Sequence, residues 1–407
     1  MHATASPANK NIYTVVFASA VIGATLMAVL TGLWVLTAIS IGLLFGFFLQ
    51  KGDLCGASAF SEVLLMKEWR KIRGLWICIV VGMAGFAILS SAGWVTLAPK
   101  PLIWANYLIG GVLFGVGMVF AGGCISGCLY KAGTGNLNSM VALPGIALGV
   151  AAVEYGPLNP LHKYLQTFII SSETGGPVTL PTLTGLSYPV LAAFFLAATL
   201  AAAVYMKRKP ALAADALPVY QRIFTRSWKP WAAGLMIGIL GSAAYLSSVP
   251  SGRNYPLGVT HGVLFAQLLI TEQNLTPVYQ KSPVPTVSTV SAAVAAPAKE
   301  VAPPPAGKKY SVWLIALVIS LVIGSWISAK LSGTARLLPR PPEQVITAFF
   351  GGLLLGVGAA IATGCVIGNI ISGWALMSVG NILFGITVVL ANWAITWFYL
   401  MGGSLRS

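Results

Sequence analysis

Long apolar runs separated by short polar breaks fill most of the chain. The runs lie near residues 12–30, 31–50, 75–93, 102–122, 138–155, 186–206, 231–248, 257–271, 311–329, 345–363 and 377–400. A hydrocarbon core about 30 Å thick needs around 20 apolar residues per spanning helix, so this pattern is typical of an integral membrane protein. We predict an all-α polytopic membrane protein with two pseudo-symmetric halves and about eight to ten transmembrane helices.

Several apolar stretches are too short or too rich in glycine to cross a bilayer. They are the run at 257–271 and the residues directly after Asp53, Cys124 and Cys365. Irregular backbone at membrane depth is tolerated only where protein or a water-filled cavity surrounds it, because unpaired N–H and C=O groups are costly in lipid. We therefore expect short re-entrant helices at these places.

The first two runs form one long uncharged region. From Asn11 to Gln50 the sequence has no charged residue for forty positions. That length exceeds the apolar region of a secretory signal, and no small-residue cleavage site followed by a polar domain is present. We expect two retained spans in a tight hairpin rather than a cleaved leader.

The composition also points to a membrane protein. Of 407 residues, 57% are hydrophobic and 8% are charged, whereas a soluble domain has roughly 25% charged residues. The formal net charge is +15, and the basic residues gather in short breaks, namely Lys67, Arg70, Lys71 and Arg73, then Lys207, Arg208 and Lys209, then Arg336 and Arg340. This is the pattern of cytoplasmic loops, so the charge indicates topology first, an anion-attracting field second, and no nucleic-acid partner.

Two polar segments divide the chain. Residues 207–229 form a basic, proline-containing connector, which we expect to be a cytoplasmic link between a first half at 1–206 and a second half at 230–407. Residues 277–309 are rich in Pro, Ala and Val and have little to pack, so we expect an extended solvent-exposed loop that interrupts the second half.

An internal repeat relates the two halves. The segment 110–127, GGVLFGVGMVFAGGCISG, aligns without gaps to 351–368, GGLLLGVGAAIATGCVIG, with ten identities in eighteen positions and an offset of 241 residues (351 minus 110). Many transporters are built from such repeats, with the substrate site between the halves near the midplane. The pattern does not distinguish a parallel from an inverted repeat.

Glycines in the repeat have two interpretations. Gly111 and Gly115, like Gly352 and Gly356, have the spacing that lets transmembrane helices approach closely, and we interpret them as packing residues. The end of each repeat is different, because it reads G-C-x-x-G. The residues are Gly123, Cys124 and Gly127 in the first copy and Gly364, Cys365 and Gly368 in the second. A glycine turn at membrane depth indicates a broken helix, whose half-helix ends suit an ion.

Cysteine at these turns would add a neutral, polarizable S–H group. A thiol in an apolar setting stays protonated and can donate a weak hydrogen bond to an anion. Conduction requires such weak sites, because a site that binds tightly does not release its cargo. The competing interpretation is a small buried hydrophobe, which we prefer for Cys78. Cys128 is set aside as a pathway residue because the second repeat has Asn369 there.

A third broken span precedes the first repeat. In 42–60, GLLFGFFLQKGDLCGASAF, the apolar run breaks at Lys51 and Asp53, and Cys55 and Gly56 follow at once. We expect Lys51 and Asp53 either to pair near the mouth of a pathway or to mark where the chain meets water. The second half echoes GLLFG as GLMIG at 234–238 but no cysteine follows, so the halves differ in chemistry.

Two further ionisable residues lie in apolar runs. Glu154 follows ALGVAAV, and His261 lies in GVTHGVLF. Ionisable groups in a membrane are expensive and often functional. We expect these two to lie at an interface or to satisfy a backbone group.

The combination of LCGASAF after a broken span, AGGCISGCLYKAGTG and TGCVIGN resembles the YeeE/YedE family of sulfur-transport membrane proteins. The resemblance covers most of the chain apart from the N-terminal tail and the loop at 277–309. It implies uptake of thiosulfate across the inner membrane on a pseudo-symmetric helical scaffold. It also implies that Cys55, Cys124 and Cys365 pass the anion along by transient hydrogen bonds. One branch of the family is associated with selenium, so selenium compounds remain an alternative substrate.

Two other classes of function remain open. A membrane thiol–disulfide enzyme normally has paired, solvent-reachable cysteines, often as C-x-x-C, which this sequence lacks. A noncatalytic subunit could use its glycine helices to dock a partner. The chain has no P-loop, H-E-x-x-H or dinucleotide motif, so we expect no enzyme activity, cofactor or metal. A cytoplasmic sulfurtransferase that consumes the anion is a candidate partner, beside the lipid bilayer.

Overall fold

A computed structural model describes residues 7–172, 175–205, 223–272, 275–278, 308–337 and 339–401. Ten helical stretches in these ranges are long and apolar enough to span a membrane. Their main helices are α1 (Pro7–Thr31), α2 (Thr37–Gly52), α4 (Arg70–Ser91), α5 (Trp104–Phe120), α7 (Leu137–Glu154), α10 (Tyr188–Tyr205), α12 (Pro230–Ser248), α14 (Val312–Ser332), α15 (Pro342–Ile361) and α17 (Val379–Thr396). The predicted all-α polytopic fold is confirmed.

Short helices occupy the places where re-entrant segments are predicted. They are α3 (Gly56–Met66), α6 (Ile125–Gly133), α13 (Thr260–Thr271) and a π-helix, η2 (Val366–Ser372), which continues into α16 (Gly373–Ala375). At 1.5 Å per residue even the twelve residues of α13 extend only about 18 Å, less than a bilayer core. The remaining short helices are η1 (Trp34–Leu36), α8 (Asn159–Leu165), α9 (Leu180–Thr184) and the π-helix η3 (Trp397–Met401).

Two small sheets lie in the connections. β1 (Leu102–Ile103) pairs antiparallel with β2 (Ile169–Ile170), and β3 (Leu275–Val278) pairs in parallel with β4 (Lys308–Ser311). The sheet of β3 and β4 therefore closes the two ends of the predicted loop at 277–309, whose residues 279–307 lie outside the described ranges. Most of the predicted connector at 207–229 also lies outside them, so the boundaries of the two halves stay a prediction.

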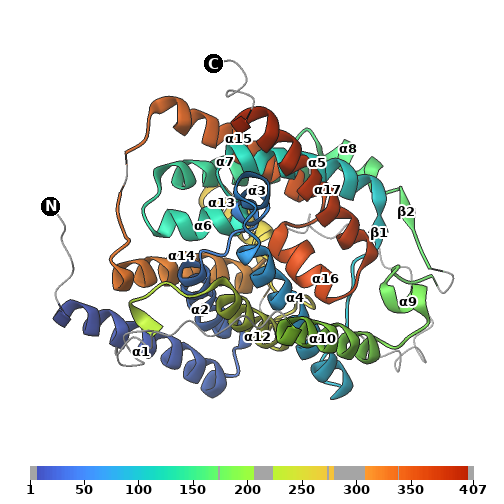
Figure 1. The fold of residues 1–407 in the computed structure, drawn as a ribbon, viewed down its shortest axis with the longest axis horizontal. Coiled ribbons are helices and arrows are strands. Elements are labelled where there is room, and N and C mark those ends of the chain that lie inside the picture. Colours follow the sequence, from blue (N-terminus) through green and yellow to red (C-terminus); the bar gives the residue numbers. More distant parts are fainter. Residues whose placement is uncertain are drawn as a thin grey trace, which may run out of the picture.

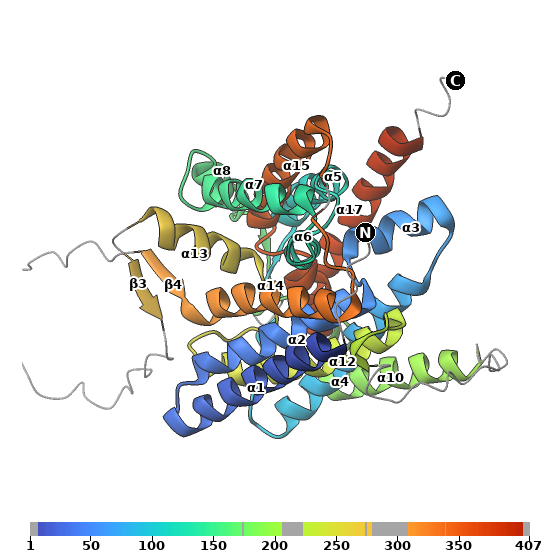
Figure 2. The same ribbon diagram turned by 90° about the vertical axis from the view of Figure 1, so that its left-hand side faces the viewer.

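The long helices gather into two bundles (Figure 1). The lower bundle consists of α2, α4, α12 and α14, and the upper bundle of α5, α7, α15 and α17. Figure 2 shows the same two bundles after a quarter turn, with α6 between them and with α13 and α3 towards opposite sides of the molecule. Broken helices therefore lie where the bundles meet.

The outer surface of the molecule is apolar, as a lipid-facing surface requires. α1 and α10 flank the lower bundle (Figure 1), and their large apolar side chains are largely exposed, including Val29, Leu30, Phe194 and Leu200. A soluble monomer rarely exposes a continuous apolar surface of this kind. The exposed perimeter supports a multi-pass membrane protein.

Glycine contacts show that the internal repeat is inverted. A methyl group added to Gly110, early in α5, would lie 2.8 Å from the carbonyl oxygen of Gly358, late in α15. One added to Gly117, late in α5, would lie 3.0 Å from the carbonyl oxygen of Gly351, early in α15. The two helices therefore run antiparallel, and each glycine contacts the repeat equivalent of the other. This reciprocity is what a pseudo-twofold axis between the copies produces.

The predicted packing glycines lie in helix seams. Gly111 and Gly115 lie against α17, whereas Gly352 and Gly356 lie against α7. Methyl groups there would come within 2.2–3.0 Å of the facing helix, so only glycine permits this approach. Their interpretation as packing residues is confirmed.

The same symmetry relates the members of the lower bundle. Gly46 of the GLLFG segment in α2 lies against Leu321 of α14, and Gly234 of the GLMIG segment in α12 lies against Gly74 of α4. Thus α2 corresponds to α12, and α4 corresponds to α14. The short helices α3 and α13, which follow α2 and α12, occupy corresponding places in the two halves.

Candidate functional site

Two of the three predicted cysteines meet in the interior. Cys55 is the residue before α3 and Cys124 the residue before α6, each with extended backbone. Both are buried, and their sulfur atoms lie 3.7 Å apart. Gly127, on the first turn of α6, makes room for them, because a methyl group there would lie 2.4 Å from the sulfur of Cys55.

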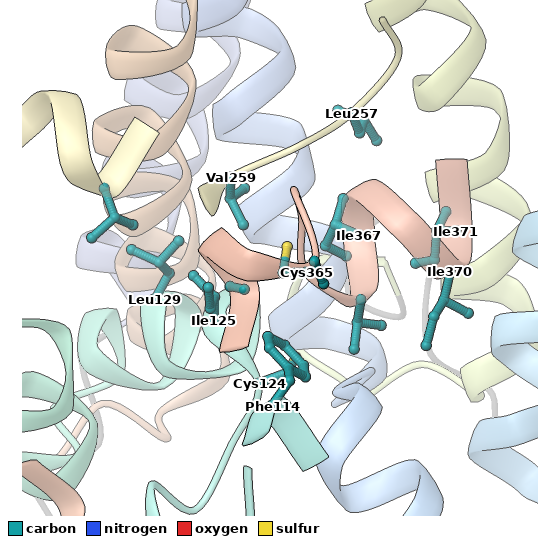
Figure 3. Packing of buried hydrophobic residues seen from close by; sticks show 14 of the residues in the cluster. Phe114, Cys124, Ile125, Leu129, Leu257, Val259, Cys365, Ile367, Ile370 and Ile371 are labelled. Atoms are coloured by element: carbon teal, nitrogen blue, oxygen red, sulfur yellow. The ribbon is translucent and has the colours of Figure 1, made fainter. Parts of the chain in front are cut away.

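The third cysteine lies at the adjoining broken helix. Cys365 precedes η2 in the same extended conformation and is also buried. Gly56, next to Cys55, packs on Val366, next to Cys365, since a methyl group on Gly56 would lie 2.9 Å from a methyl carbon of Val366. Figure 3 shows Cys124 and Cys365 in one buried cluster at the meeting point of the broken helices.

The second half lacks a counterpart of Cys55. Since α3 and α13 correspond, Cys55 before α3 corresponds to Val259 before α13. Val259 is fully buried and lies in the same cluster as Cys365 (Figure 3). The arrangement of thiols is therefore asymmetric. Cys55 and Cys124 lie together at the Gly–Cys turn before α6, whereas Cys365 is the single thiol of this group at the Gly–Cys turn before η2.

A cavity of about 180 Å³ opens beside Cys365. It is called the Lys100 cavity here, and its lining includes Lys100, Arg253, Tyr255, Thr260, His261, Thr363, Gly364 and Gly368. The hydroxyl of Thr260 is buried there without a hydrogen-bond partner. A cavity with two cations and a free hydroxyl group suits a small polar anion.

The two cations of this cavity are bound only by uncharged groups among the described residues. The Lys100 ammonium donates to the Thr363 carbonyl and, over 2.9 Å, to the Asn369 side-chain oxygen. Arg253 donates to two backbone carbonyls and faces the ring of Tyr255. Burial lowers the pKa of Lys100 to about 7 and that of Arg253 to about 10. Among the described residues, neither Lys100 nor Arg253 has an acidic partner that would neutralise its charge.

A second cavity, of about 220 Å³, lies near the end of α2 and the start of α4. This Asp53 cavity is lined by Gly52, Asp53, Glu62, Glu68, Arg70, Lys71 and Pro230. The positive charge of Lys71 in this cavity is neutralised, because Lys71 forms ion pairs of 2.6 Å with both Asp53 and Glu62. The Tyr130 hydroxyl donates to the remaining oxygen of Asp53 over 2.7 Å. The two cavities thus differ sharply in their balance of charge.

Lys51 does not pair with Asp53, so that alternative is wrong. Asp53 ends α2 in the left-handed conformation, with φ 44°, which sends its side chain away from the helix. Lys51 is buried and donates to the Phe224 carbonyl and to Ser332, both over 2.6 Å. Lys51 therefore ties connecting segments to α2, whereas Asp53 faces a cavity.

The sequence also singles out two further cysteines, Cys78 and Cys128, and two ionisable residues, Glu154 and His261. Cys78 is buried in the seam between α4 and α12, as predicted. Cys128 is buried beside the first turn, with its sulfur 4.0 Å from the Ala121 carbonyl oxygen. Glu154 and His261 contact each other over 3.2 Å at the edge of the Lys100 cavity, a pairing that sequence reasoning missed.

Lys100, Arg253 and Tyr255 were also missed by sequence reasoning. The two basic residues stand alone in the short breaks LAPKPL and PSGRNY, outside the basic clusters. That isolation was the available signal, since a solitary cation on the side opposite the basic clusters does not follow the positive-inside pattern.

Comparisons with known proteins relate the chain to transporters. A family described as Sulphur transport matches residues 51–394. The chain is 28% identical over 368 residues to a protein of Escherichia coli K12 named Thiosulfate transporter TsuA, an alignment that covers 89% of this chain and 94% of that protein. A protein of the same name from Spirochaeta thermophila is 28% identical over 89% of this chain and 98% of its own length. A protein of Escherichia coli named Probable transporter YedE is 32% identical over 121 residues, or 29% of each chain.

Proposed function

Because the chain belongs to the sulphur transport family, we propose that it takes up thiosulfate through a route lined by Cys55, Cys124 and Cys365. The observation that carries this proposal is the contact between two buried thiols, because the sulfur atoms of Cys55 and Cys124 lie 3.7 Å apart. The Lys100 cavity is lined by Gly364, the residue before Cys365, and the Asp53 cavity is lined by Asp53, two residues before Cys55. The names of the full-length relatives favour thiosulfate over other sulfur anions.

The thiols are suited to passing the anion along rather than to binding it tightly. A protonated thiol is a weak donor, so each cysteine can hydrogen-bond the anion without holding it. The spacing of Cys55 and Cys124 lets an anion contact the second sulfur before it leaves the first. Ser126, whose hydroxyl lies 3.3 Å from the Cys124 sulfur, supplies another neutral donor at this step.

The difference between the cavities gives the proposed route two unlike ends. Lys100 and Arg253 attract an anion, whereas in the Asp53 cavity two carboxylates already compensate Lys71. The cluster at 67–73 and Arg336 lie on the side of the Asp53 cavity. Arg70 lines this cavity, and Thr334, two residues before Arg336, contacts Gln50 near the end of α2. By the positive-inside rule this side faces the cytoplasm. The anion is captured outside and released inside, where a cytoplasmic sulfurtransferase could consume it.

A second function is favoured by one specific contact. Sequence spacing offers no cysteine pair, yet the fold places Cys55 and Cys124 with their sulfur atoms 3.7 Å apart. That proximity is compatible with a membrane thiol–disulfide protein. Both thiols are buried, so a protein partner could not reach them in this conformation, and transport remains the preferred function.

Uptake into proteoliposomes tests the proposal. The purified chain should carry radiolabelled thiosulfate in a saturable manner, with weaker competition by sulfate or selenite. A preference for selenite would move the assignment to a selenium compound. Absence of uptake for all three anions, with folded protein in the vesicles, would contradict the proposal and favour a docking subunit.

A further inference from the structure

The two Gly–Cys turns share a backbone conformation that is unusual for their sequence. In each turn the residue two before the cysteine is left-handed, Gly122 with φ 68° and Thr363 with φ 55°. Thr363 is β-branched, and such residues rarely adopt this conformation. The structure therefore keeps the turn alike in both copies even where glycine is replaced.

A lysine binds the carbonyl group of this left-handed residue in both turns. Lys131 donates to the Gly122 oxygen over 2.8 Å, and Lys100 donates to the Thr363 oxygen. Lys131 follows Cys124 by seven residues in α6, and its repeat equivalent is Ser372. Lys100 comes from the loop before α5, in the other half of the chain. The two lysines therefore reach equivalent places in the fold from unrelated places in the sequence.

We propose that Lys100 and Lys131 are charge-supplying and positioning residues of the pathway, one at each Gly–Cys turn. Each ammonium group binds a carbonyl oxygen of its turn and provides the positive charge that neutral thiols lack. The ligand is a small dianion. This inference rests on the proposed function, because it assigns the residues that stabilise the transported anion.

At the second turn the charge of Lys100 is available to an anion. Its hydrogen bonds within the described residues all go to uncharged oxygens, those of Thr363 and Asn369, and Arg253 adds a second cation to the same cavity. The contact with the Thr363 hydroxyl, at 3.5 Å, is long, so an anion can replace it at little cost. A dianion in this cavity meets two positive charges beside Cys365.

At the Gly–Cys turn before α6, Lys131 has N–H groups that remain available to an anion. The ammonium has three N–H groups and donates one hydrogen bond within the described part of the chain, to Gly122. The Lys131 ammonium lies at this turn, because Gly122, to which it donates, is two residues before Cys124. Asp53 is already engaged by Lys71 and by Tyr130, so it neutralises Lys131 only in part. An anion that passes between Cys55 and Cys124 therefore comes under the field of Lys131.

The competing explanation is purely structural, because lysine often satisfies carbonyl groups at the end of a helix. Glutamine separates the two roles, since it keeps an N–H donor and loses the charge. Arginine keeps the charge with a different shape. Lys330→Gln is the matched control, because Lys330 faces the ring of Trp326 on α14, away from both cavities. Like Lys100→Gln, Lys330→Gln removes one positive charge from the protein.

Thiosulfate uptake by the full chain in proteoliposomes tests the inference. Lys100→Gln should raise the half-saturating thiosulfate concentration by about tenfold or more, and Lys100→Arg should restore most of it. Lys131→Gln should mainly lower the maximal rate, because it acts beyond the capture cavity. Rates that match those of Lys330→Gln in both variants would overturn the inference, as would failure of arginine to restore function. If Lys100→Gln does not fold, the pH dependence of uptake by the wild type and by Lys100→Arg tests the charge instead, because both proteins keep an N–H donor at this position. Identical pH profiles would then overturn the role of Lys100.

Calorimetric titration of the purified chain with thiosulfate separates failure of this inference from failure of the proposed function. Wild-type protein that binds thiosulfate but moves none would refute transport and leave the inference testable. Binding should then weaken in Lys100→Gln and recover in Lys100→Arg. Equal binding by the wild type and Lys100→Gln would refute the role of Lys100 whether or not uptake occurs.

Discussion

Gly127→Ala should obstruct the proposed pathway at the contact between Cys55 and Cys124. The added methyl group would lie 2.4 Å from the Cys55 sulfur and 3.5 Å from the Cys124 sulfur. Ordinary contact distances between such atoms are about 3.5–4.0 Å, so the overlap with Cys55 exceeds about 1 Å. Gly127 lies within α6, so the thiol of Cys55 must move instead, away from Cys124.

The cost of this displacement follows from overpacking in well-packed interiors, about 1–3 kcal/mol. If the strain acts on translocation, uptake falls by about fivefold to 140-fold, since each 1.4 kcal/mol changes a rate tenfold. The free energy of unfolding should fall by a similar 1–3 kcal/mol. The protein should remain folded, because only one side chain must move.

Uptake and thermal unfolding are measured together for four proteins. Gly23→Ala is the control, because a methyl group at Gly23 in α1 has no atom within 4 Å. Gly368→Ala, the repeat equivalent, should leave stability unchanged for the same reason. Gly127→Ala combined with Cys55→Ala should recover stability, since the clash is gone, but not uptake, since the thiol is gone. Wild-type uptake and stability in Gly127→Ala would refute the reasoning.

Two further predictions concern buried lysines. Uptake should fall as the pH on the Lys100 side rises from 6 to 8, because the pKa of Lys100 is lowered to about 7 by burial. The ammonium is then about nine-tenths charged at pH 6 and about one-tenth charged at pH 8. Lys100→Arg should flatten the measured pH profile, and an unchanged profile would contradict the role of this charge. Lys51→Met should lower the free energy of unfolding by about 1–3 kcal/mol, because it removes the buried hydrogen bonds that Lys51 donates to the Phe224 carbonyl and to Ser332. Uptake per folded molecule should persist, and a selective loss of uptake would place Lys51 on the pathway.

The helices and both Gly–Cys turns could be predicted from the sequence because their causes are local. The length of an apolar run predicts a spanning helix, and the same order of glycines and cysteine in the two internal copies predicts the same turn in both. The orientation of the repeat could not be predicted. It depends on which glycines face each other, as Gly110 faces Gly358, and the spacing of glycines is the same for either orientation.

The charged part of the site could not be predicted either. Lys100, Arg253 and Tyr255 come from separate short breaks and converge only when the two bundles pack. Lys51 and Asp53 are close in sequence but diverge in space, because the left-handed conformation of Asp53 redirects its side chain. Hydropathy reports which segments enter the membrane, and it carries no information on which polar side chains meet between them.

The most direct test of the cysteine route compares Cys124→Ala and Cys365→Ala with Cys78→Ala. All three substitutions remove one buried thiol, but Cys78 lies in the seam of α4 and α12, away from both cavities. The measurement is the initial rate of radiolabelled thiosulfate uptake per folded molecule. Strong loss of uptake in Cys124→Ala and Cys365→Ala, with near-normal uptake in Cys78→Ala, is the predicted result. Normal uptake in both pathway variants would contradict the role of the thiols.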